Sequence, residues 1–554
     1  MQTSKGSQFI LDYLGKCGCQ YIFGCPGTTE VPILDALVDL ESPQYILIPQ
    51  EGVAVSAAEG WARVTGRIGV ANLHANVGLA NGVSQIIAAQ MAAVPLLILN
   101  CVKSREILGR GAFTTAHDHQ EMVKQFTKWD WLSLRSAELM EDLRRAIQMA
   151  VALPAGPSYL GVPQDLLEAE VVGEYPAPIE YMKHSPSKYE TMKAAELLVR
   201  SKFPVILAGS GVAIEGAMEA IIKLANCLGS AVVTENRLHQ DYNAFPTDHP
   251  YYLGPIKPNS YLFSQADVLF AVGTRLFVEF QASPPWIPPD LPIIHLHPDS
   301  SQIGRLYPVE VSLHGSVREG LEDIYEAAES MVMQSVVKQR SGQVKQMHNA
   351  YKENLELQLT KFRSTYPIQV PYLAESISRI MNHSTTVVVD APTSNDEMSE
   401  YLPKYNEQSF YTSASSGSLG WGLGAALGVK LGAPERVVLS IVGDGAFMFG
   451  IPALWTAAKY HIPVIFIVIN NASYAAVKAG LLRYNQNAAK TGVFPGTDIS
   501  GTNFAEVAKG FGVQAQRIRD PIVLEDMLKK VTALNEPYLL EVMTDPDYIG
   551  NISR

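Results

Sequence analysis

The feature that most constrains the fold is an alternation of short β-branched runs with longer helical patterns along the whole chain. Two stretches in the first part, 51–66 and 79–93, have the spacing of helices. The runs between them predict buried strands: YIFG (21–24), YILIP (45–49), IGVANLH (68–74) and VPLLILN (94–100). Strand and helix in repeated succession predict an α/β, doubly wound domain with a central parallel sheet.

The same pattern restarts twice, so the chain divides into several such domains. Its 554 residues are too many for one hydrophobic core. A polar, proline-containing stretch at 173–190 predicts a linker, and a charged stretch at 333–363 predicts a surface helix and connector. We therefore expect three α/β domains of similar size, at residues 1–172, 188–330 and 360–554.

The composition excludes several classes of protein. Hydrophobic residues make up 47% and charged residues 18%, and no unbroken apolar run is long enough to span a membrane. The net charge of −12 argues against nucleic acid as a partner. The start of the chain lacks a basic segment followed by an apolar one, and the five cysteines are few and odd in number, so we expect a cytoplasmic protein with free thiols. Cys17 and Cys19 are expected to be helix residues rather than metal ligands.

One carboxylate stands between two glycines at the end of an apolar run, in VGDGAFMFG (442–450). After Asp444 come a helical pattern and the run VIFIVINN, which ends in Asn470 and Asn471. In a parallel sheet with right-handed crossovers these two strand ends lie at one edge. Asp444, the Asn471 amide oxygen and a loop carbonyl would supply three hard oxygen ligands, which suits Mg²⁺ shared with phosphates. The flanking glycines would let backbone N–H groups approach a diphosphate.

Other interpretations of the glycine-rich segments are weaker. Asp and Gly also form ordinary turns at strand ends. The stretches GSGVAIEG (209–216) and GWGLGAA (420–426) partly match a dinucleotide fingerprint. Neither directly follows a strand in a complete unit with a well-placed acid, so a nicotinamide cofactor is not favoured.

The spacing of GDG and Asn-Asn is that of thiamine-diphosphate enzymes, and the chain resembles this family over essentially its whole length. The resemblance is to the 2-oxo acid decarboxylase and acetolactate synthase superfamily, and is closest to the benzoylformate decarboxylases. Three further stretches carry it: FGCPGTTEVPIL (23–34), NLHANVGLANGV (72–83) and TSASSGSLGWGLGAALGVKLGAPER (412–436). It implies a pyrimidine-binding first domain, a middle domain and a diphosphate-binding third domain.

The resemblance implies thiamine diphosphate and Mg²⁺ as cofactors. Asp444, Asn471 and the backbone carbonyl of Ser473 would hold the metal. Leu419 would force the cofactor into its bent shape, and the Gly417 carbonyl would accept from its amino group. The remaining cofactor-binding positions would be Thr393, Ser394, Gly443, Gly445, Ala446, Tyr474 and Ala475. Ala446 stands where the family has a hydroxyl residue, so one diphosphate contact would be made by backbone alone.

Three residues of the first domain are candidate catalytic groups. Glu51 lies at the start of a helix, where an acid is favoured by the helix dipole. Beside an Asp444–Asn471 site, we interpret it instead as the carboxyl group that activates the cofactor's pyrimidine. The resemblance implies that it does so across a subunit interface, which makes a homodimer the minimum and a homotetramer the expected assembly. His74 would relay protons, although a strand-end histidine bonded to backbone is the alternative, and Thr28 would contact the substrate carboxylate.

The substrate pocket departs from the family pattern. Phe280 takes the place of a second active-site histidine, and Ala476 and Val477 are small and apolar. His117 and His119 could replace the lost donor, but we expect them to be surface residues. The resemblance implies non-oxidative decarboxylation of a 2-oxo acid, benzoylformate-like, to an aldehyde and CO₂, with carboligation as a side activity.

Three alternatives stay open. One is a carboligase or lyase that forms or cleaves 2-hydroxy ketones, acetolactate-synthase-like or benzaldehyde-lyase-like. Another is a relative that binds FAD in its middle domain. The third is a binding module without enzymatic activity, which the presence of Glu51, Asp444 and Asn471 disfavours.

Overall fold

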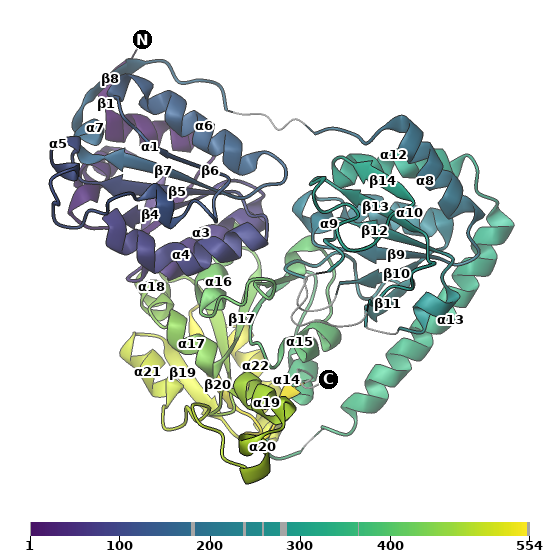
Figure 1. Cartoon of the computed structure of the whole chain (residues 1–554). Coiled ribbons are helices and arrows are strands. Elements are labelled where there is room, and N and C mark those ends of the chain that lie inside the picture. Colours follow the sequence, from purple (N-terminus) through teal and green to yellow (C-terminus); the bar gives the residue numbers. More distant parts are fainter. Residues whose placement is uncertain are drawn as a thin grey trace.

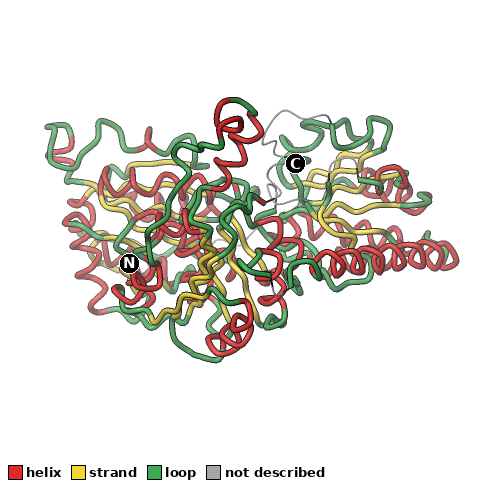
Figure 2. The backbone as a smooth tube through the Cα atoms, turned by 90° about the horizontal axis from the view of Figure 1, so that it is seen from below, coloured by secondary structure: helices red, strands yellow, loops and turns green. Residues whose placement is uncertain are grey.

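Three parallel-sheet domains lie at the corners of a triangle in the computed structural model (Figure 1). The structure describes residues 2–178, 183–235, 240–257, 260–277, 285–363 and 365–550. Each domain has a six-stranded sheet, and helices cover its faces (Figure 2). The expected α/β fold with three doubly wound domains is therefore confirmed.

The first domain has the strand order β3-β2-β4-β5-β7-β6, and all neighbours are parallel. Its strands are β2 (Tyr21–Cys25), β3 (Gln44–Leu47), β4 (Gly69–His74), β5 (Leu96–Val102), β6 (Trp129–Leu132) and β7 (Pro157–Pro163). Its helices are α1 (Gly6–Lys16), α2 (Val31–Ala36), α3 (Glu51–Thr65), α4 (Ala75–Met91), α5 (Arg105–Leu108), α6 (Leu139–Val151) and α7 (Gln164–Glu168). A small antiparallel pair, β1 (Gln2–Lys5) with β8 (Glu170–Gly173), joins the two ends of the domain.

The middle domain has the order β11-β10-β9-β12-β13-β14. Its strands are β9 (Pro204–Ala208), β10 (Ala231–Thr234), β11 (Tyr252–Pro255), β12 (Val268–Val272), β13 (Ile293–His297) and β14 (Val311–His314). Its helices are α8 (Lys188–Arg200), α9 (Gly211–Ile214), α10 (Met218–Leu228), α11 (Leu262–Gln265) and α12 (Val317–Glu329).

The third domain has the order β16-β15-β17-β18-β20-β19. Its strands are β15 (Thr385–Asp390), β16 (Phe410–Thr412), β17 (Val437–Gly443), β18 (Val464–Asn470), β19 (Gln514–Ile518) and β20 (Tyr538–Met543). Its helices are α14 (Val370–Ser378), α15 (Asn395–Tyr401), α16 (Trp421–Gly432), α17 (Asp444–Gly450), α18 (Ala453–Lys459), α19 (Ala475–Tyr484), α20 (Asn487–Thr491), α21 (Phe504–Gly510) and α22 (Leu524–Thr532).

The connection from β17 to β18 differs from the single helix that the sequence pattern suggested. It consists of two short helices, α17 and α18, which meet at Ile451 and Pro452. Proline has no backbone N–H to donate, and its ring disfavours the helical conformation of the preceding turn. The first helix therefore ends there, and β18 still returns parallel to β17.

The first and third domains are joined by close packing of α3 on α16, which lie side by side in Figure 1. Glycines make this approach possible. A Cβ atom on Gly428 would lie 1.9 Å from the carbonyl oxygen of Ala57, and one on Gly60 would lie 2.1 Å from that of Ala425. The two helix backbones therefore touch directly at these positions.

A buried arginine ties all three domains together beside this contact. Arg63 Nε donates to Glu59 Oε1 at 3.0 Å on α3, and Arg63 Nη1 donates to the carbonyl oxygens of Thr412 at 2.8 Å and Asp241 at 3.1 Å. The Trp421 indole donates to the other Glu59 oxygen at 2.9 Å. Partners of opposite charge and several hydrogen bonds offset the cost of burying this ion pair.

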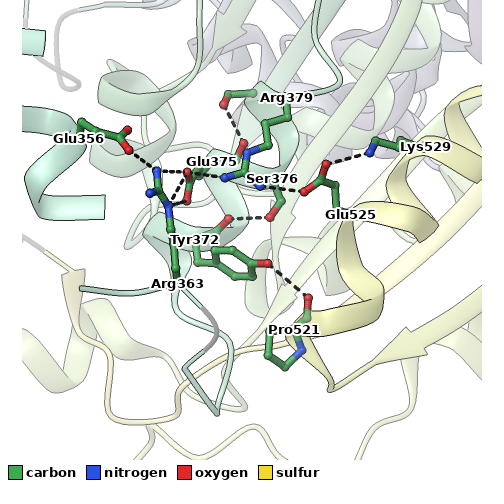
Figure 3. A network of polar contacts seen from close by, with 10 residues as sticks. Glu356, Arg363, Tyr372, Glu375, Ser376, Arg379, Pro521, Glu525 and Lys529 are labelled. Atoms are coloured by element: carbon green, nitrogen blue, oxygen red, sulfur yellow. Dashed lines mark hydrogen bonds and ion pairs between the residues drawn. The ribbon is translucent and has the colours of Figure 1, made fainter. Parts of the chain in front are cut away.

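The long helix α13 (Gln334–Leu359) leads from the middle domain to the third domain. It corresponds to the predicted surface helix. A network of ion pairs fastens its end, as Figure 3 shows. Arg363 Nε and Arg379 Nη2 both donate to Glu375 Oε1 at 2.8 Å, and Arg379 Nη1 donates to Glu525 on α22 at 2.8 Å.

Candidate active site

The candidate residues of the first domain lie where its strands end. Thr28 follows β2, Glu51 follows β3 and His74 is the last residue of β4. These three strands are adjacent and parallel, so their carboxyl ends share one edge of the sheet. The sequence placed these residues at strand ends, and the structure brings those ends together.

His74 is held in place by a buried carboxylate. Its Nδ1 atom lies 2.8 Å from Glu30 Oε2 and 2.8 Å from the hydroxyl of Thr29. Glu30 also accepts the Thr29 hydroxyl proton at 3.0 Å and the Gly27 N–H at 2.8 Å. Because the Thr29 proton points to Glu30, Nδ1 of His74 must carry the ring proton, which leaves Nε2 as the atom free for proton exchange.

Glycine at position 27 is required by this arrangement. A Cβ atom there would lie 2.4 Å from His74 Nδ1, so any side chain would displace the ring. Sequence reasoning missed Glu30. The signal was available, because an acid three residues after Gly27 at a strand end can reach back to that backbone N–H.

Glu51 is the first residue of α3 and is half-buried in the single chain. Its Oε2 atom accepts a hydrogen bond from the Asn81 amide at 3.1 Å. Gly78 lies on the same side, and a Cβ atom on it would meet Glu51 Oε1 at 3.2 Å. Gln50 caps the helix by accepting from the Val53 N–H at 2.7 Å, so the position of Glu51 at the helix start is well fixed.

Asp444 is the central acid of the third domain. It follows β17 as the first residue of α17 and is only 5% exposed. Its Oδ1 atom accepts from the Gly445 N–H at 2.8 Å, while Oδ2 is buried with no hydrogen-bond partner. Burial raises the pKa of this carboxyl from 3.8 to about 6, and it outweighs the Gly445 N–H, which bonds to Oδ1, and the backbone N–H groups of residues 471–473, which lie near the carboxyl group without forming a hydrogen bond to Oδ2.

The loop after β18 faces this acid. Asn471 is buried, and its Oδ1 atom accepts from the Ser473 N–H at 3.0 Å. The neighbouring Asn470 is used differently, because its amide donates to Glu541 at 2.7 Å and its oxygen caps Ala472. Asn470 therefore has a structural role, whereas Asn471 lies in the loop beside Asp444.

Tyr474 shapes the same loop. Its N–H donates to the Thr497 carbonyl at 2.8 Å, and a Cβ atom on Gly445 would lie 2.4 Å from its ring. Gly445 is thus needed for Tyr474 to pack against the start of α17. Ala475 begins α19 and is buried, as is Ala446 on α17. Gly443, in contrast, has open space in front of it, since a Cβ there would meet only Ala391 at 3.8 Å.

The remaining cofactor-binding candidates surround this edge of the third sheet. Ser394 is buried just before α15, and Thr393 is half-buried beside it. Gly417 is exposed and adopts a positive φ of 67°, and a Cβ atom on it would meet nothing within 4 Å. The Leu419 carbonyl accepts from Gln85 of α4 at 3.1 Å, so the first domain of the same chain holds the loop that carries it.

These residues fit a magnesium–diphosphate group. Among the described residues, no three His, Cys, Asp or Glu side chains are placed so that they could together hold a metal ion. Asp444 offers an unsatisfied buried oxygen, and the space before Gly443 is open. A divalent cation shared with phosphate oxygens requires few carboxylates from the protein. Asp444 and Asn471 would supply side-chain oxygens and Ser473 its carbonyl.

The two sets of candidates are separate within one chain. Among the described residues, no hydrogen bond or ion pair links Glu51, His74 or Thr28 to Asp444 or Asn471. Each set lies at the carboxyl edge of its own sheet.

The predictions for five further residues have different outcomes. Phe280 lies outside the described residues. Ala476 is half-buried and Val477 is exposed, both at the start of α19. His117 is exposed as expected, but His119 is not a surface residue, since it is buried and its Nε2 atom lacks a partner among the residues described. Burial lowers the pKa of His119, so it is a neutral ring at physiological pH.

The glycine-rich stretch of the middle domain is explained by packing. A Cβ on Gly209 would lie 2.5 Å from the Gly273 carbonyl oxygen, and one on Gly211 would lie 2.7 Å from the Gly273 Cα. Beside these loops, burial raises the pKa of Glu235 to about 7, and its carboxyl group accepts from the Ser210 N–H at 3.3 Å. These glycines therefore give no support to a nucleotide site.

Other general features agree with the composition. All five cysteines are free, but Cys17 and Cys19 are not helix residues as expected, because α1 ends at Lys16. Within the ranges described above, no helix is both long enough and apolar enough to cross a bilayer.

Family models match all three domains. The "Thiamine pyrophosphate enzyme, N-terminal TPP binding domain" covers residues 4–122, the "central domain" covers 191–324 and the "C-terminal TPP binding domain" covers 390–542. Together these matches span most of the chain.

Individual relatives are similar over nearly their full lengths. A "Probable acetolactate synthase large subunit" of Methanocaldococcus jannaschii is 28% identical over 98% of this chain and 92% of its own. A "Benzoylformate decarboxylase" of Pseudomonas aeruginosa is 28% identical over 98% of this chain and 99% of its own. Among solved structures, a thiamine diphosphate-dependent 4-hydroxybenzoylformate decarboxylase of Rhodococcus jostii RHA1 superposes with a TM-score of 0.85 at 25% identity, covering 98% of this chain and 99% of that one.

Proposed function

Since the chain belongs to the thiamine pyrophosphate enzyme family in all three of its domains, we propose that it decarboxylates a 2-oxo acid, benzoylformate-like, to an aldehyde and CO₂. We propose Mg²⁺ as the second cofactor and carboligation as a side activity. The observation that carries the proposal is the buried Asp444 Oδ2 atom, which has no partner in the described structure and faces the Asn471 loop. An unsatisfied buried carboxylate oxygen at the carboxyl end of a parallel strand is costly unless a ligand completes it.

The third domain would anchor the cofactor. When bound, thiamine diphosphate supplies a nucleophilic carbon and a cationic ring that accepts the electron pair left by departing CO₂. Asp444, Asn471 and Ser473 would hold Mg²⁺ on the diphosphate, and Thr393 and Ser394 would donate to phosphate oxygens. These residues take no part in bond making, because their role is to fix the diphosphate in place.

The first domain would supply the proton chemistry. Glu51 would hold a hydrogen bond to the cofactor's pyrimidine ring, and Thr28 would donate its hydroxyl to the substrate carboxylate. His74 would exchange protons with the substrate through Nε2, because Glu30 and Thr29 hold its Nδ1. A carboxylate behind the ring also stabilises the imidazolium whenever His74 holds two protons.

We propose that the active unit is at least a homodimer, and that the assembly is a homotetramer in the cytoplasm. Two exposed apolar residues support an interface at the candidate site. Phe449, on the helix that begins with Asp444, is 57% exposed, and Val77, on the helix that carries Asn81, is 49% exposed. We propose that a second chain covers both, and that it places the Glu51 set of one chain beside the Asp444 set of the other and removes water from Glu51.

The deciding experiment is product identification. The purified protein, with thiamine diphosphate and Mg²⁺ added, is incubated with pyruvate, benzoylformate and further 2-oxo acids, each with and without benzaldehyde. An aldehyde and CO₂ from a 2-oxo acid alone support the proposal. No product from any acid, with the cofactor demonstrably bound, would refute it.

Carboligation as the main activity is the second candidate. It is favoured by the similarity to acetolactate synthases and by the sequence position of Phe280, since a phenyl ring cannot return a proton to the product. Phe280→His should then raise aldehyde release relative to ketol formation, and an unchanged ratio would count against this role. A yellow purified protein would indicate a flavin, and retained cofactor without any turnover would indicate a binding module.

A further inference from the structure

A lysine that the motifs did not single out lies at the same edge of the first sheet. Lys103 directly follows β5, whose neighbour β4 ends in His74. His74 pairs in register with Cys101, so Lys103 stands two residues beyond the His74 position at the carboxyl edge. Its side chain is half-buried, and Nζ donates to the Thr28 hydroxyl oxygen at 3.2 Å. An ammonium group therefore lies in contact with a candidate substrate-binding residue.

The charge of Lys103 has no acidic partner in the described part of the chain, where no carboxylate lies within 4.0 Å of Nζ. The nearby acids are engaged elsewhere. Arg105 pairs with Asp165 at 2.7 Å, and Glu30 already receives bonds from His74, Thr29 and Gly27.

Lysine has three N–H donors, and the Thr28 oxygen satisfies one of them. Thr28 meanwhile keeps its own hydroxyl proton for donation. Thr28 can therefore donate to the reacting carboxylate, while Lys103 has two N–H donors left for an anion at this edge.

The reaction restricts which anion this can be. A carboxylate that leaves as CO₂ loses its negative charge in the transition state, so a cation that bound it would stabilise the ground state more than the transition state. A group that stays anionic throughout the reaction carries no such penalty. Resting on the proposed decarboxylation of a 2-oxo acid, but with an acidic side chain in place of the uncharged phenyl group of benzoylformate, we propose that Lys103 recognises a second anionic group, a carboxylate that the substrate retains, and so selects 2-oxo dicarboxylic acids over 2-oxo monocarboxylic acids.

The test compares two substrates of equal chain length, 2-oxopentanedioate and 2-oxopentanoate, with the holoenzyme. Lys103→Met keeps the length of the side chain and removes its charge. We expect it to lower kcat/KM for the dicarboxylate by about 10- to 100-fold, mainly through KM, because a hydrogen bond to a charged group is lost. The value of kcat/KM for the monocarboxylate should fall much less, because that substrate has no second carboxylate for Lys103 to bind. Lys103→Arg should retain part of the preference, since it keeps the charge.

Arg105→Met is the matched control, because it removes a cation two residues away that is already paired with Asp165. This control should leave the ratio of kcat/KM for the two substrates unchanged. The proposal is overturned if Lys103→Met lowers kcat/KM equally for both substrates, or if the wild-type enzyme does not prefer the dicarboxylate. Either result leaves the proposed decarboxylation intact.

A binding measurement separates this proposal from the reaction itself. Glutarate and pentanoate lack the reactive carbonyl, so calorimetry with the holoenzyme reports recognition without turnover. Tighter binding of glutarate that Lys103→Met abolishes supports the anion site even if no 2-oxo acid is converted. Equal binding of both acids to wild type and variant refutes it.

Discussion

We expect replacement of Asp444 by Asn to raise the stability of the cofactor-free protein and to remove the stabilisation that the cofactor gives. Burial raises the pKa of Asp444 from 3.8 to about 6, so keeping it ionised costs the empty protein about 3 kcal/mol at pH 8. Asp444→Asn removes that charge while retaining an oxygen that can accept from the Gly445 N–H, whose present distance is 2.8 Å. We therefore expect the cofactor-free variant to be more stable than wild type by about 1–3 kcal/mol at pH 8.

The sign of the pH dependence follows from the raised pKa. The folded protein binds the Asp444 proton more tightly than the unfolded chain does, so the wild type loses stability as pH rises through about 6. The cost of ionisation falls to about 1.6 kcal/mol at pH 5 and about 0.5 kcal/mol at pH 4. The advantage of Asp444→Asn over wild type should shrink in the same order.

The assay is urea unfolding of chelator-treated protein at pH 8, 5 and 4, followed by fluorescence. Asp526→Asn, which changes an exposed carboxylate on α22, is the control and should show no such trend. Added thiamine diphosphate and Mg²⁺ should stabilise wild type and leave Asp444→Asn unaffected, because the metal needs the carboxylate. A variant that is less stable than wild type at pH 8 without cofactor, or that still binds Mg²⁺ equally well, would refute the reasoning.

Further expectations concern packing and proton transfer. Gly428→Ala should lower the free energy of unfolding by about 3 kcal/mol, because its Cβ atom would meet a backbone carbonyl group. Gly480→Ala is the control and should raise the free energy of unfolding by about 0.5–1 kcal/mol, because Gly480 lies in helix α19 with open space around it. Equal effects of the two substitutions would exclude the close helix contact. Glu30→Gln should lower kcat by about 10- to 100-fold, and combining it with His74→Ala should add nothing to the loss from His74→Ala alone, as double-mutant kinetics would show. Glu51→Gln should lower kcat by about 10²- to 10⁴-fold with cofactor affinity unchanged by calorimetry, and a loss of affinity instead would give Glu51 a binding role.

The strands that end at the candidate site residues could be predicted from the sequence because local patterns determine them. The apolar runs before His74 and Asp444 became β4 and β17, and both residues lie at the strand ends where the patterns placed them. Parallel pairing brings the ends of neighbouring strands together. Because a single crossover connects β17 to β18, the sequence was enough to predict that Asp444 and Asn471 lie close to each other.

Contacts between segments that are distant in the sequence could not be predicted in the same way. Lys103 and Thr28 are far apart in the chain, and neither belongs to a spacing pattern that would link them. The bonds from Arg63 to the carbonyls of Thr412 and Asp241 likewise depend on how three separately folded units meet. His119 was misjudged because its position in a polar loop gave no sign that the folded chain would bury it.

The direct contact between α3 and α16 also has a consequence for assembly of the chain. Ala57 and Gly428 touch, yet the rest of the first domain, the whole middle domain and the connecting helix α13 lie between them in the sequence. Each domain can form its sheet during synthesis, but this contact closes only after the third domain has emerged. Until then the small-residue surface of α3 is exposed, so we expect the nascent chain to be most prone to aggregation late in synthesis. A protease cut in the linker before α8 should, after folding, leave two fragments that stay bound through α3, α16 and Arg63.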